Sequence, residues 1–176
     1  MDFRQPQDLL VARAANIRLL LLDVDGVLTD GRLYFSNSGE EMKAFSTLDG
    51  HGIKMLQSIG VRVGIITGRT STLVQKRCAD LGITLLLQGR EDKITALGEI
   101  LDASGLNPEQ VAFAGDDLPD LPVLQKVGLG FSVPGGHADV KAAAAAITLA
   151  AGGMGAVREI TDFLIKAQGK YTSFLS

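Results

Sequence analysis

The sequence has one cysteine, no long apolar run and no excess of basic residues, and each absence excludes a class of protein. Cys78 stands alone among 176 residues, so no intramolecular disulfide can form, and a reduced, cytoplasmic setting is expected. No apolar run approaches the roughly 20 residues of a membrane-spanning helix, and the first eight residues lack a signal-peptide pattern. Lys and Arg number 17 against 20 Asp and Glu, which leaves no basic stripe for nucleic acid. We therefore expect neither a membrane nor a nucleic acid as a partner.

The sequence does contain short apolar runs that alternate with segments of helical period, typical of a parallel sheet covered by helices on both faces. Hydrophobic residues make up 46% of the chain, and its length suits one core, so we expect a single domain over 1–176 with an α/β, doubly wound fold. Strands are expected near 17–23, 61–66, 83–87, 110–114 and 127–132. Helices are expected near 8–15, 50–59, 70–81, 92–104, 119–126, 137–143 and 155–167, and the alanines at 142–146 are interpreted as small-residue packing.

Residues 31–46 break this alternation. Two partly apolar segments, 31–36 and 41–46, flank Asn37-Ser38-Gly39-Glu40, which predicts a β-hairpin. A lone two-stranded ribbon with exposed apolar side chains is only marginally stable. We expect this one to pack against another subunit near the mouth of the site; folding back onto its own domain is the alternative.

The most informative segment is an apolar run that ends in two carboxylates and a glycine. Leu19–Leu22 lead directly into Asp23 and Asp25, and Gly26 follows. The spacing places the two aspartate side chains on opposite sides of an extended backbone, and the glycine permits a sharp turn beside them. This suits one carboxylate attacking phosphorus while the other handles the proton of the leaving oxygen. An Asx-rich turn without chemistry is the competing interpretation.

Two later segments offer groups that can bind phosphate. Thr67, Gly68 and Arg69 follow a second apolar run, and a hydroxyl with exposed backbone N–H groups at a strand end can hold phosphate oxygens. Lys93 opens a helical segment, where a cation can neutralise a transferring phosphoryl group. Each signal is weak alone, because a Thr-Gly turn and a solvated helical lysine are both common.

A further apolar run leads into three acids. Asp116, Asp117 and Asp120 lie within five positions, and they repel one another unless a cation sits among them. In open parallel sheets, ligands bind beyond the carboxyl ends of the strands. Asp23 and Asp116 share a cation only if the first and fourth strands are neighbours, so the sequence predicts one site at that edge of the sheet.

The motifs resemble, in their order, those of the haloacid dehalogenase superfamily of phosphohydrolases. They are Asp-x-Asp-Gly, Thr-Gly-Arg, Lys and Gly-Asp-Asp-x-x-Asp, and they run from Asp23 to Asp120. Segments 49–53, 152–159 and 167–170 make the resemblance strongest to the branch that hydrolyses 3-deoxy-D-manno-octulosonate 8-phosphate (KDO 8-phosphate), over nearly the whole chain. This implies a Rossmann-like core without a cap domain, Mg²⁺ as cofactor, a small-molecule sugar-acid phosphate as substrate, and a homotetramer serving lipopolysaccharide biosynthesis. A branch acting on nine-carbon sugar acids shares most of these motifs, so the sugar length stays open.

The resemblance also implies a role for each site residue. Asp23 is the nucleophile that forms a phospho-aspartyl intermediate, and Asp25 is the acid and base that contacts the substrate. Mg²⁺ is held by the carboxylates of Asp23 and Asp116 and by the backbone carbonyl of Asp25, while Asp117 and Asp120 orient water ligands and the site lysine. The phosphate oxygens are held by three further groups: the Thr67 side chain, the Gly68 N–H and Lys93.

Recognition of the sugar acid is assigned to residues around the site. Arg69 follows the phosphate-binding turn and can pair with a carboxylate. Arg77, about two helical turns further on, is a second candidate for binding the sugar acid. For His51 two interpretations stay open: it contacts the substrate, or it caps the helix that follows. The tail at 168–176 is expected to fray or to fold over a neighbouring subunit's site.

A phosphorylatable signalling module of the receiver type is the main alternative from another class. Receivers also place acids and Mg²⁺ on a doubly wound sheet, but their phosphorylated aspartate follows the third strand. Here the third predicted strand ends in Leu87-Gln88-Gly89, without an acid. A catalytically silent homologue is a further alternative, because the presence of every motif residue does not prove activity.

Overall fold

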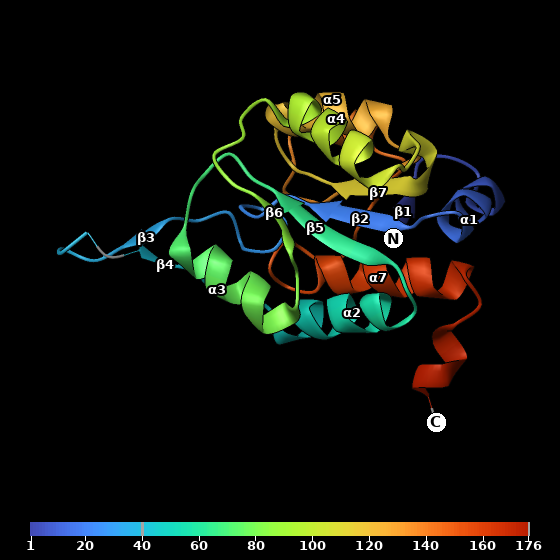
Figure 1. Ribbon diagram of the computed structural model, residues 1–176, viewed down its shortest axis with the longest axis horizontal. Coiled ribbons are helices and arrows are strands. Elements are labelled where there is room, and N and C mark those ends of the chain that lie inside the picture. Colours follow the sequence, from blue (N-terminus) through green and yellow to red (C-terminus); the bar gives the residue numbers. More distant parts are fainter. Residues whose placement is uncertain (40, 176) are drawn as a thin grey trace.

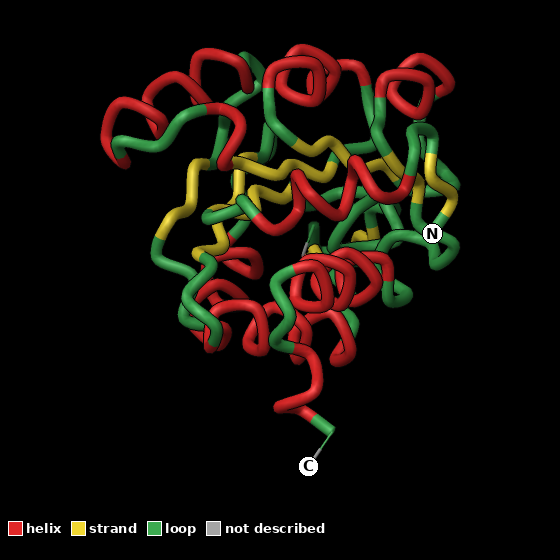
Figure 2. Tube along the Cα trace, turned by 90° about the vertical axis from the view of Figure 1, so that its right-hand side faces the viewer, coloured by secondary structure: helices red, strands yellow, loops and turns green. Residues whose placement is uncertain are grey.

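The computed structural model describes residues 1–39 and 41–175 and shows a central sheet between two layers of helices (Figure 1, Figure 2). The sheet strands are β1 (Asp2–Phe3), β2 (Leu19–Leu22), β5 (Arg62–Ile66), β6 (Leu85–Leu87), β7 (Val111–Ala114), β8 (Leu129–Ser132) and β9 (Ala146–Ile147). They lie in the order β1-β9-β8-β7-β2-β5-β6. Only β1 runs antiparallel to its neighbour. The predicted α/β, doubly wound fold is confirmed.

The helices divide between the two faces of the sheet. The α-helices are α1 (Gln7–Ala15), α2 (Thr47–Ser58), α3 (Thr72–Leu81), α4 (Lys93–Ser104), α5 (Leu121–Lys126), α6 (Ala138–Ala143) and α7 (Ala156–Ala167). Short 3-10 helices cover Pro108–Gln110, Leu118–Asp120 and Tyr171–Phe174. Buried residues of α1, α2, α3 and α7 share one core cluster with the sheet, and those of α4, α5 and α6 share another. Two hydrophobic cores therefore sandwich the strands.

The continuous apolar run of β2 follows from this arrangement. Leu20 and Leu22 belong to the core on the α2 and α7 side, whereas Leu19 and Leu21 belong to the core on the α4 and α5 side. Successive side chains of a strand point to opposite faces, so a strand covered on both faces needs apolar residues at every position. The chain emerges from between the two layers of helices just before Asp23.

The five predicted strands and seven predicted helices are all present, whereas β1 and β9 were not predicted. The alanines at 142–146 do more than pack, because Ala146 begins β9 and pairs with Phe3 of β1 and with Phe131 of β8. Strands of two residues are too short to carry a periodicity that a sequence can reveal. Their pairing joins the start of the chain to the far edge of the sheet.

The segment around Asp49 and Gly52 holds α2 close to α7. Asp49 accepts hydrogen bonds from the backbone N–H groups of Arg158 (2.8 Å) and Gly155 (3.4 Å), and thereby caps the start of α7. A Cβ atom at Gly52 would lie 2.3 Å from Oγ1 of Thr161. Residues 49–53 therefore contribute to the packing of α2 against α7.

The hairpin strands β3 (Tyr34–Phe35) and β4 (Glu41–Met42) pair in antiparallel fashion and project from the body of the molecule (Figure 1). Phe35 is 60% exposed and Met42 is 63% exposed. The described residues between β2 and α2 form turns and this hairpin, with no additional domain. The prediction of a projecting hairpin is confirmed, and its packing against another subunit stays a prediction.

The tail also departs from the expectation of fraying. Tyr171–Phe174 form a 3-10 helix, and both terminal residues of this helix pack against the core that contains α7. The Lys166 ammonium lies 4.5 Å from the centre of the Tyr171 ring.

Within the part of the chain that the structure describes, no helix is both long and apolar enough to span a membrane.

Candidate active site

Most of the predicted site residues gather at the carboxyl ends of the central strands. β2 lies between β5 and β7, so the segments that follow these three strands meet at one edge of the sheet. A cleft of about 560 Å³ opens there. Its lining comprises Asp23, Asp25, Gly31, Thr67, Gly68, Arg69, Glu91, Lys93, Asp116, Asp117, Pro119 and Asp120. The neighbouring first and fourth predicted strands are confirmed, because β2 pairs directly with β7.

A buried ion-pair network lies at the floor of the cleft. The Lys93 ammonium donates to Asp23 at 2.8 Å and to Asp120 at 2.5 Å, and the lysine side chain is only 5% exposed. Burial acts to lower the pKa of Lys93, but the two carboxylates outweigh it and raise that pKa. Burial raises the pKa of Asp23 to about 6, against the opposing influence of Lys93. Lys93 is therefore a fixed cation in the site, not a lysine on a solvated helix face.

Asp116 faces this network from the end of β7 and provides the best indication of a metal. Ligand oxygens of Asp23, Asp116 and Asp120 all lie within 4.8 Å of one another. Burial, followed by repulsion from Asp23 and Asp120, raises the pKa of Asp116 to about 8. Its Oδ1 atom is buried and has no hydrogen-bond partner among the described residues. Clustered carboxylate oxygens with an unsatisfied member fit a hard divalent cation such as Mg²⁺.

Asp120 and Gly26 determine where Asp116 lies. Oδ2 of Asp120 accepts hydrogen bonds from the backbone N–H groups of Asp116 (2.9 Å) and Asp117 (3.1 Å). Asp120 therefore orders the loop that follows β7, in addition to holding Lys93. The Asp117 side chain instead accepts from the N–H of Leu118 at 2.8 Å and caps a short 3-10 helix. Gly26 has φ of +97°, and a Cβ there would lie 2.1 Å from the Asp116 carboxylate. The glycine therefore provides the space in which the two acidic segments approach each other.

The segment after β5 reaches the same cleft. Thr67 is buried, its N–H donates to Leu87 of β6 at 2.9 Å, and Gly68 follows it on the cleft wall. Arg69 is 47% exposed at the rim, with its Nε atom 3.7 Å from Asp25. The structure thus brings a hydroxyl, a backbone turn and a half-exposed cation to the mouth of the site.

His51 and Arg77 do not line the cleft. His51 lies exposed on α2. Arg77 donates to the backbone carbonyl of Ser46 at 3.0 Å, and its guanidinium carbon lies 5.7 Å from the centre of the Phe45 ring. In this chain Arg77 holds the start of α2 against α3.

Sequence reasoning missed Lys43 and Glu41, which the hairpin brings into contact with the cleft residues Asp25 and Arg69. The Lys43 ammonium binds Asp25 and lies 3.3 Å from Glu41. Glu41 also accepts from Ser71 at 3.1 Å and lies 3.4 Å from Arg69. The prediction that the hairpin stands beside the site was the one signal for these residues, but the angle of the hairpin decides which of its charged residues face the acids after β2.

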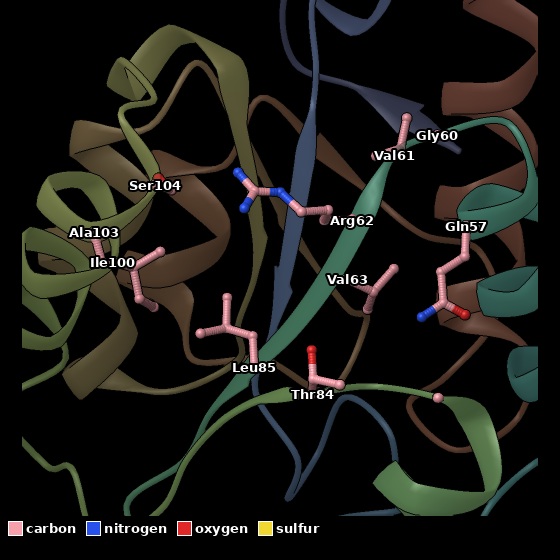
Figure 3. Close-up of a pocket in the computed structure, with 11 residues that line it drawn as sticks. Gln57, Gly60, Val61, Arg62, Val63, Thr84, Leu85, Ile100, Ala103 and Ser104 are labelled. Atoms are coloured by element: carbon pink, nitrogen blue, oxygen red, sulfur yellow. The ribbon is translucent and has the colours of Figure 1, made fainter.

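A second hollow, of about 470 Å³, lies at the opposite ends of β5 and β6 (Figure 3). Arg62 extends toward the side where Ile100 and Ser104 lie (Figure 3). Arg62 is the one charged side chain among the described residues that line it, and no acid accompanies it. The hollow therefore lacks the paired groups that make the first cleft a candidate for catalysis.

Comparison with known proteins agrees with this geometry. The sequence model of haloacid dehalogenase-like hydrolases matches residues 86–160. The 3-deoxy-D-manno-octulosonate 8-phosphate phosphatase KdsC of Escherichia coli (strain K12) is 51% identical over 160 residues, which cover 91% of this chain and 85% of that protein. The chain belongs to the KDO 8-phosphate phosphatase family. The resemblance seen in the motifs is confirmed.

Solved structures of this family have the same fold. The KDO 8-phosphate phosphatase of Moraxella catarrhalis, in complex with magnesium, phosphate and KDO, is 39% identical with a TM-score of 0.94, over 97% of this chain and 98% of that one. The enzyme of Yersinia pestis is 48% identical with a TM-score of 0.92, over 94% of this chain and 89% of that one. Family members are phosphatases, and the magnesium-bound relative agrees with the acidic cluster described above.

Proposed function

We propose that this chain is a Mg²⁺-dependent phosphomonoesterase that hydrolyses KDO 8-phosphate to the free sugar acid and phosphate. The observation that carries the proposal is the contact of Asp23, at the end of β2, with Lys93, while Asp116 stands across from it with an unsatisfied oxygen. Identity of 51% to a KDO 8-phosphate phosphatase supports the eight-carbon substrate over the nine-carbon alternative. It also disfavours a receiver-type module.

Asp23 acts as the nucleophile in this proposal. One of its carboxylate oxygens attacks phosphorus, the bond from phosphorus to the sugar oxygen breaks, and a phospho-aspartyl group forms. Water then attacks the same phosphorus and releases phosphate, which restores the Asp23 carboxylate. Lys93 already contacts Asp23, so it limits the repulsion between the nucleophile and an anionic substrate.

Asp25 transfers the protons. It gives a proton to the sugar oxygen as that oxygen leaves, and it takes one from the attacking water in the second step. Its side chain lines the cleft two residues beyond Asp23, where a leaving group can reach it. Because an alkoxide is a poor leaving group, loss of this proton transfer slows sugar phosphates most.

The phosphate and the metal occupy the floor of the cleft. Mg²⁺, when bound, neutralises phosphate charge, and we assign it to the carboxylates of Asp23 and Asp116 with the backbone carbonyl of Asp25. The other phosphate oxygens are assigned to Thr67, the Gly68 N–H and Lys93.

Recognition of the sugar acid starts at the rim. Arg69 is half-exposed there and can form a bidentate pair with the carboxylate of a sugar acid. His51 and Arg77 do not line the cleft of this chain, so a role for either in binding the sugar would require a rearrangement or another subunit.

Residues 1–176 form a single domain in this proposal, which the pairing of β1 with β9 supports. A homotetramer is the proposed assembly, and the exposed apolar side chains of the hairpin support it. These side chains are Leu33, Tyr34, Phe35 and Met42. The proposed location is the cytoplasm, where a lone buried thiol such as Cys78 stays reduced.

Phosphate release from a panel of sugar phosphates tests the function. The panel contains the eight-carbon and nine-carbon keto-deoxy sugar acid phosphates and a hexose 6-phosphate, each with Mg²⁺ and with a chelator. We expect KDO 8-phosphate to have the highest kcat/KM and its hydrolysis to stop with the chelator. A higher kcat/KM for the nine-carbon substrate would overturn the assignment of the sugar.

A further inference from the structure

Asp25 differs from the other acids of the site in what holds its side chain. Asp23 and Asp120 bind Lys93, and Asp120 also binds two backbone N–H groups. In the proposed function only the backbone carbonyl of Asp25 meets the metal. Its carboxylate must therefore be oriented by something else, since a proton donor works only when aimed at the leaving oxygen.

Lys43 is placed to supply that orientation. Its ammonium contacts Oδ1 of Asp25 from the base of the hairpin, and its side chain is only 2% exposed. Lys43 does not line the cleft, so its charge is directed at Asp25 and not at an incoming substrate. Arg69 reaches Oδ2 of Asp25 only at 3.7 Å and is half-exposed, which makes it the weaker holder.

Glu41 fixes Lys43 in turn. Its carboxylate lies 3.3 Å from the Lys43 ammonium and 3.4 Å from Arg69, and it accepts from the Ser71 hydroxyl at 3.1 Å. Two acids and two cations thus form a closed network between the hairpin and the segment after β5. Removal of Lys43 would leave only the half-exposed Arg69 as a cation between the carboxylates of Asp25 and Glu41.

We propose that Lys43 is a positioning residue that aims the Asp25 carboxylate at the leaving oxygen, and that Glu41 holds Lys43 for this purpose. The proposal rests on the proposed phosphatase function. It gives the hairpin a second role, because the strand that carries Glu41 also orders the proton donor of its own subunit.

Substrates that differ in their need for a proton provide the test. A sugar alkoxide needs protonation as it leaves, whereas the nitrophenolate of p-nitrophenyl phosphate leaves without it. The full-length Lys43→Gln variant, assayed with Mg²⁺ in single turnover so that the common hydrolysis of the phospho-enzyme does not set the rate, should therefore lose about 100-fold in the rate of Asp23 phosphorylation with KDO 8-phosphate and under about threefold with p-nitrophenyl phosphate. Asp25→Asn should show the same selective loss, and Lys43→Arg should recover part of the activity.

Lys54 provides the matched control, because it is an exposed lysine on α2 outside the cleft. Lys54→Gln should match the wild type with both substrates. If Lys43→Gln does not fold, Glu41→Gln, which leaves Asp25 untouched, should show a smaller selective loss in the same assay.

Equal losses with both substrates in the Lys43 variant, or no loss with either, would overturn the positioning role. Wild-type release of phosphate from KDO 8-phosphate separates the two ideas. If the wild type hydrolyses KDO 8-phosphate and the variant lacks selectivity, only the role of Lys43 falls. If the wild type does not hydrolyse it, the proposed function fails, and the role of Lys43 falls with it.

Discussion

Gly52→Ala tests whether the close approach of α2 to α7 stabilises the fold. A Cβ at position 52 would lie 2.3 Å from Oγ1 of Thr161, 2.9 Å from Cδ of Arg158 and 3.2 Å from its Cα. The hydroxyl of Thr161 already donates to the Arg158 carbonyl at 2.9 Å, so it cannot turn away without losing a hydrogen bond. The new methyl group must therefore push the helices apart.

The expected magnitude combines two opposing effects. Overpacking of a core costs about 1–3 kcal/mol, and a lost hydrogen bond adds about 1 kcal/mol. Alanine in place of a glycine inside a helix stabilises that helix by about 1 kcal/mol, which offsets part of this cost. We expect a net loss of roughly 1–3 kcal/mol in the free energy of unfolding.

Gly98 offers a matched control, because it is a glycine inside α4 where an added Cβ would meet no neighbouring atom within 4 Å. Gly98→Ala should stabilise the protein by about 1 kcal/mol, so the two variants should differ by about 2–4 kcal/mol, or roughly 4–16 °C in Tm. Thermal unfolding by circular dichroism at one protein concentration measures this difference. Equal Tm values for the two variants would refute the reasoning, since α2 and α7 could then separate without cost.

Three further predictions concern the metal, the assembly and the cysteine. Asp116→Ala should abolish Mg²⁺ binding in calorimetry whereas Asp25→Asn retains it, and the reverse order would contradict the metal assignment. Replacement of Leu33 and Phe35 by Glu should give smaller particles on sedimentation that still cleave p-nitrophenyl phosphate, whereas a monomeric wild type would contradict the proposed assembly. Burial raises the pKa of the Cys78 thiol to about 11, so iodoacetamide at pH 8 should alkylate it only in urea; rapid alkylation of the folded protein would contradict its burial.

The fold and the floor of the site were predictable because local patterns determine them. The run Leu19–Leu22 needs a strand covered on both faces, and a parallel strand ending in Asp23 must deliver that acid to the ligand-binding edge of the sheet. Asp116 follows an apolar run and a glycine that mark the end of a strand, whereas Lys93 gave only a weak signal of its own and took its role from the order of the motifs. Only their meeting in space required the strand order, which the shared-cation argument also supplied.

The rim of the site was not predictable in the same way. Lys43 contacts Asp25 from 18 positions along the chain, and that contact depends on the angle at which the hairpin leaves the core. Arg77 and His51 lie on helices whose rotation decides whether they face the cleft, and the packing at Gly50 and Gly52 sets that rotation. A Cβ at Gly50 would lie 2.3 Å from the Arg77 guanidinium, a contact that no spacing in the sequence reveals.

Chemical trapping of the phosphoryl group on the enzyme tests the central claim most directly. The wild-type protein with Mg²⁺ is mixed with KDO 8-phosphate, quenched in acid during turnover and treated with borohydride, which reduces an acyl phosphate to an alcohol. Mass mapping should locate the reduced side chain at Asp23, and Asp23→Asn should show no reduction and no phosphate release. Reduction at another carboxylate, or rapid phosphate release by Asp23→Asn, would contradict the account.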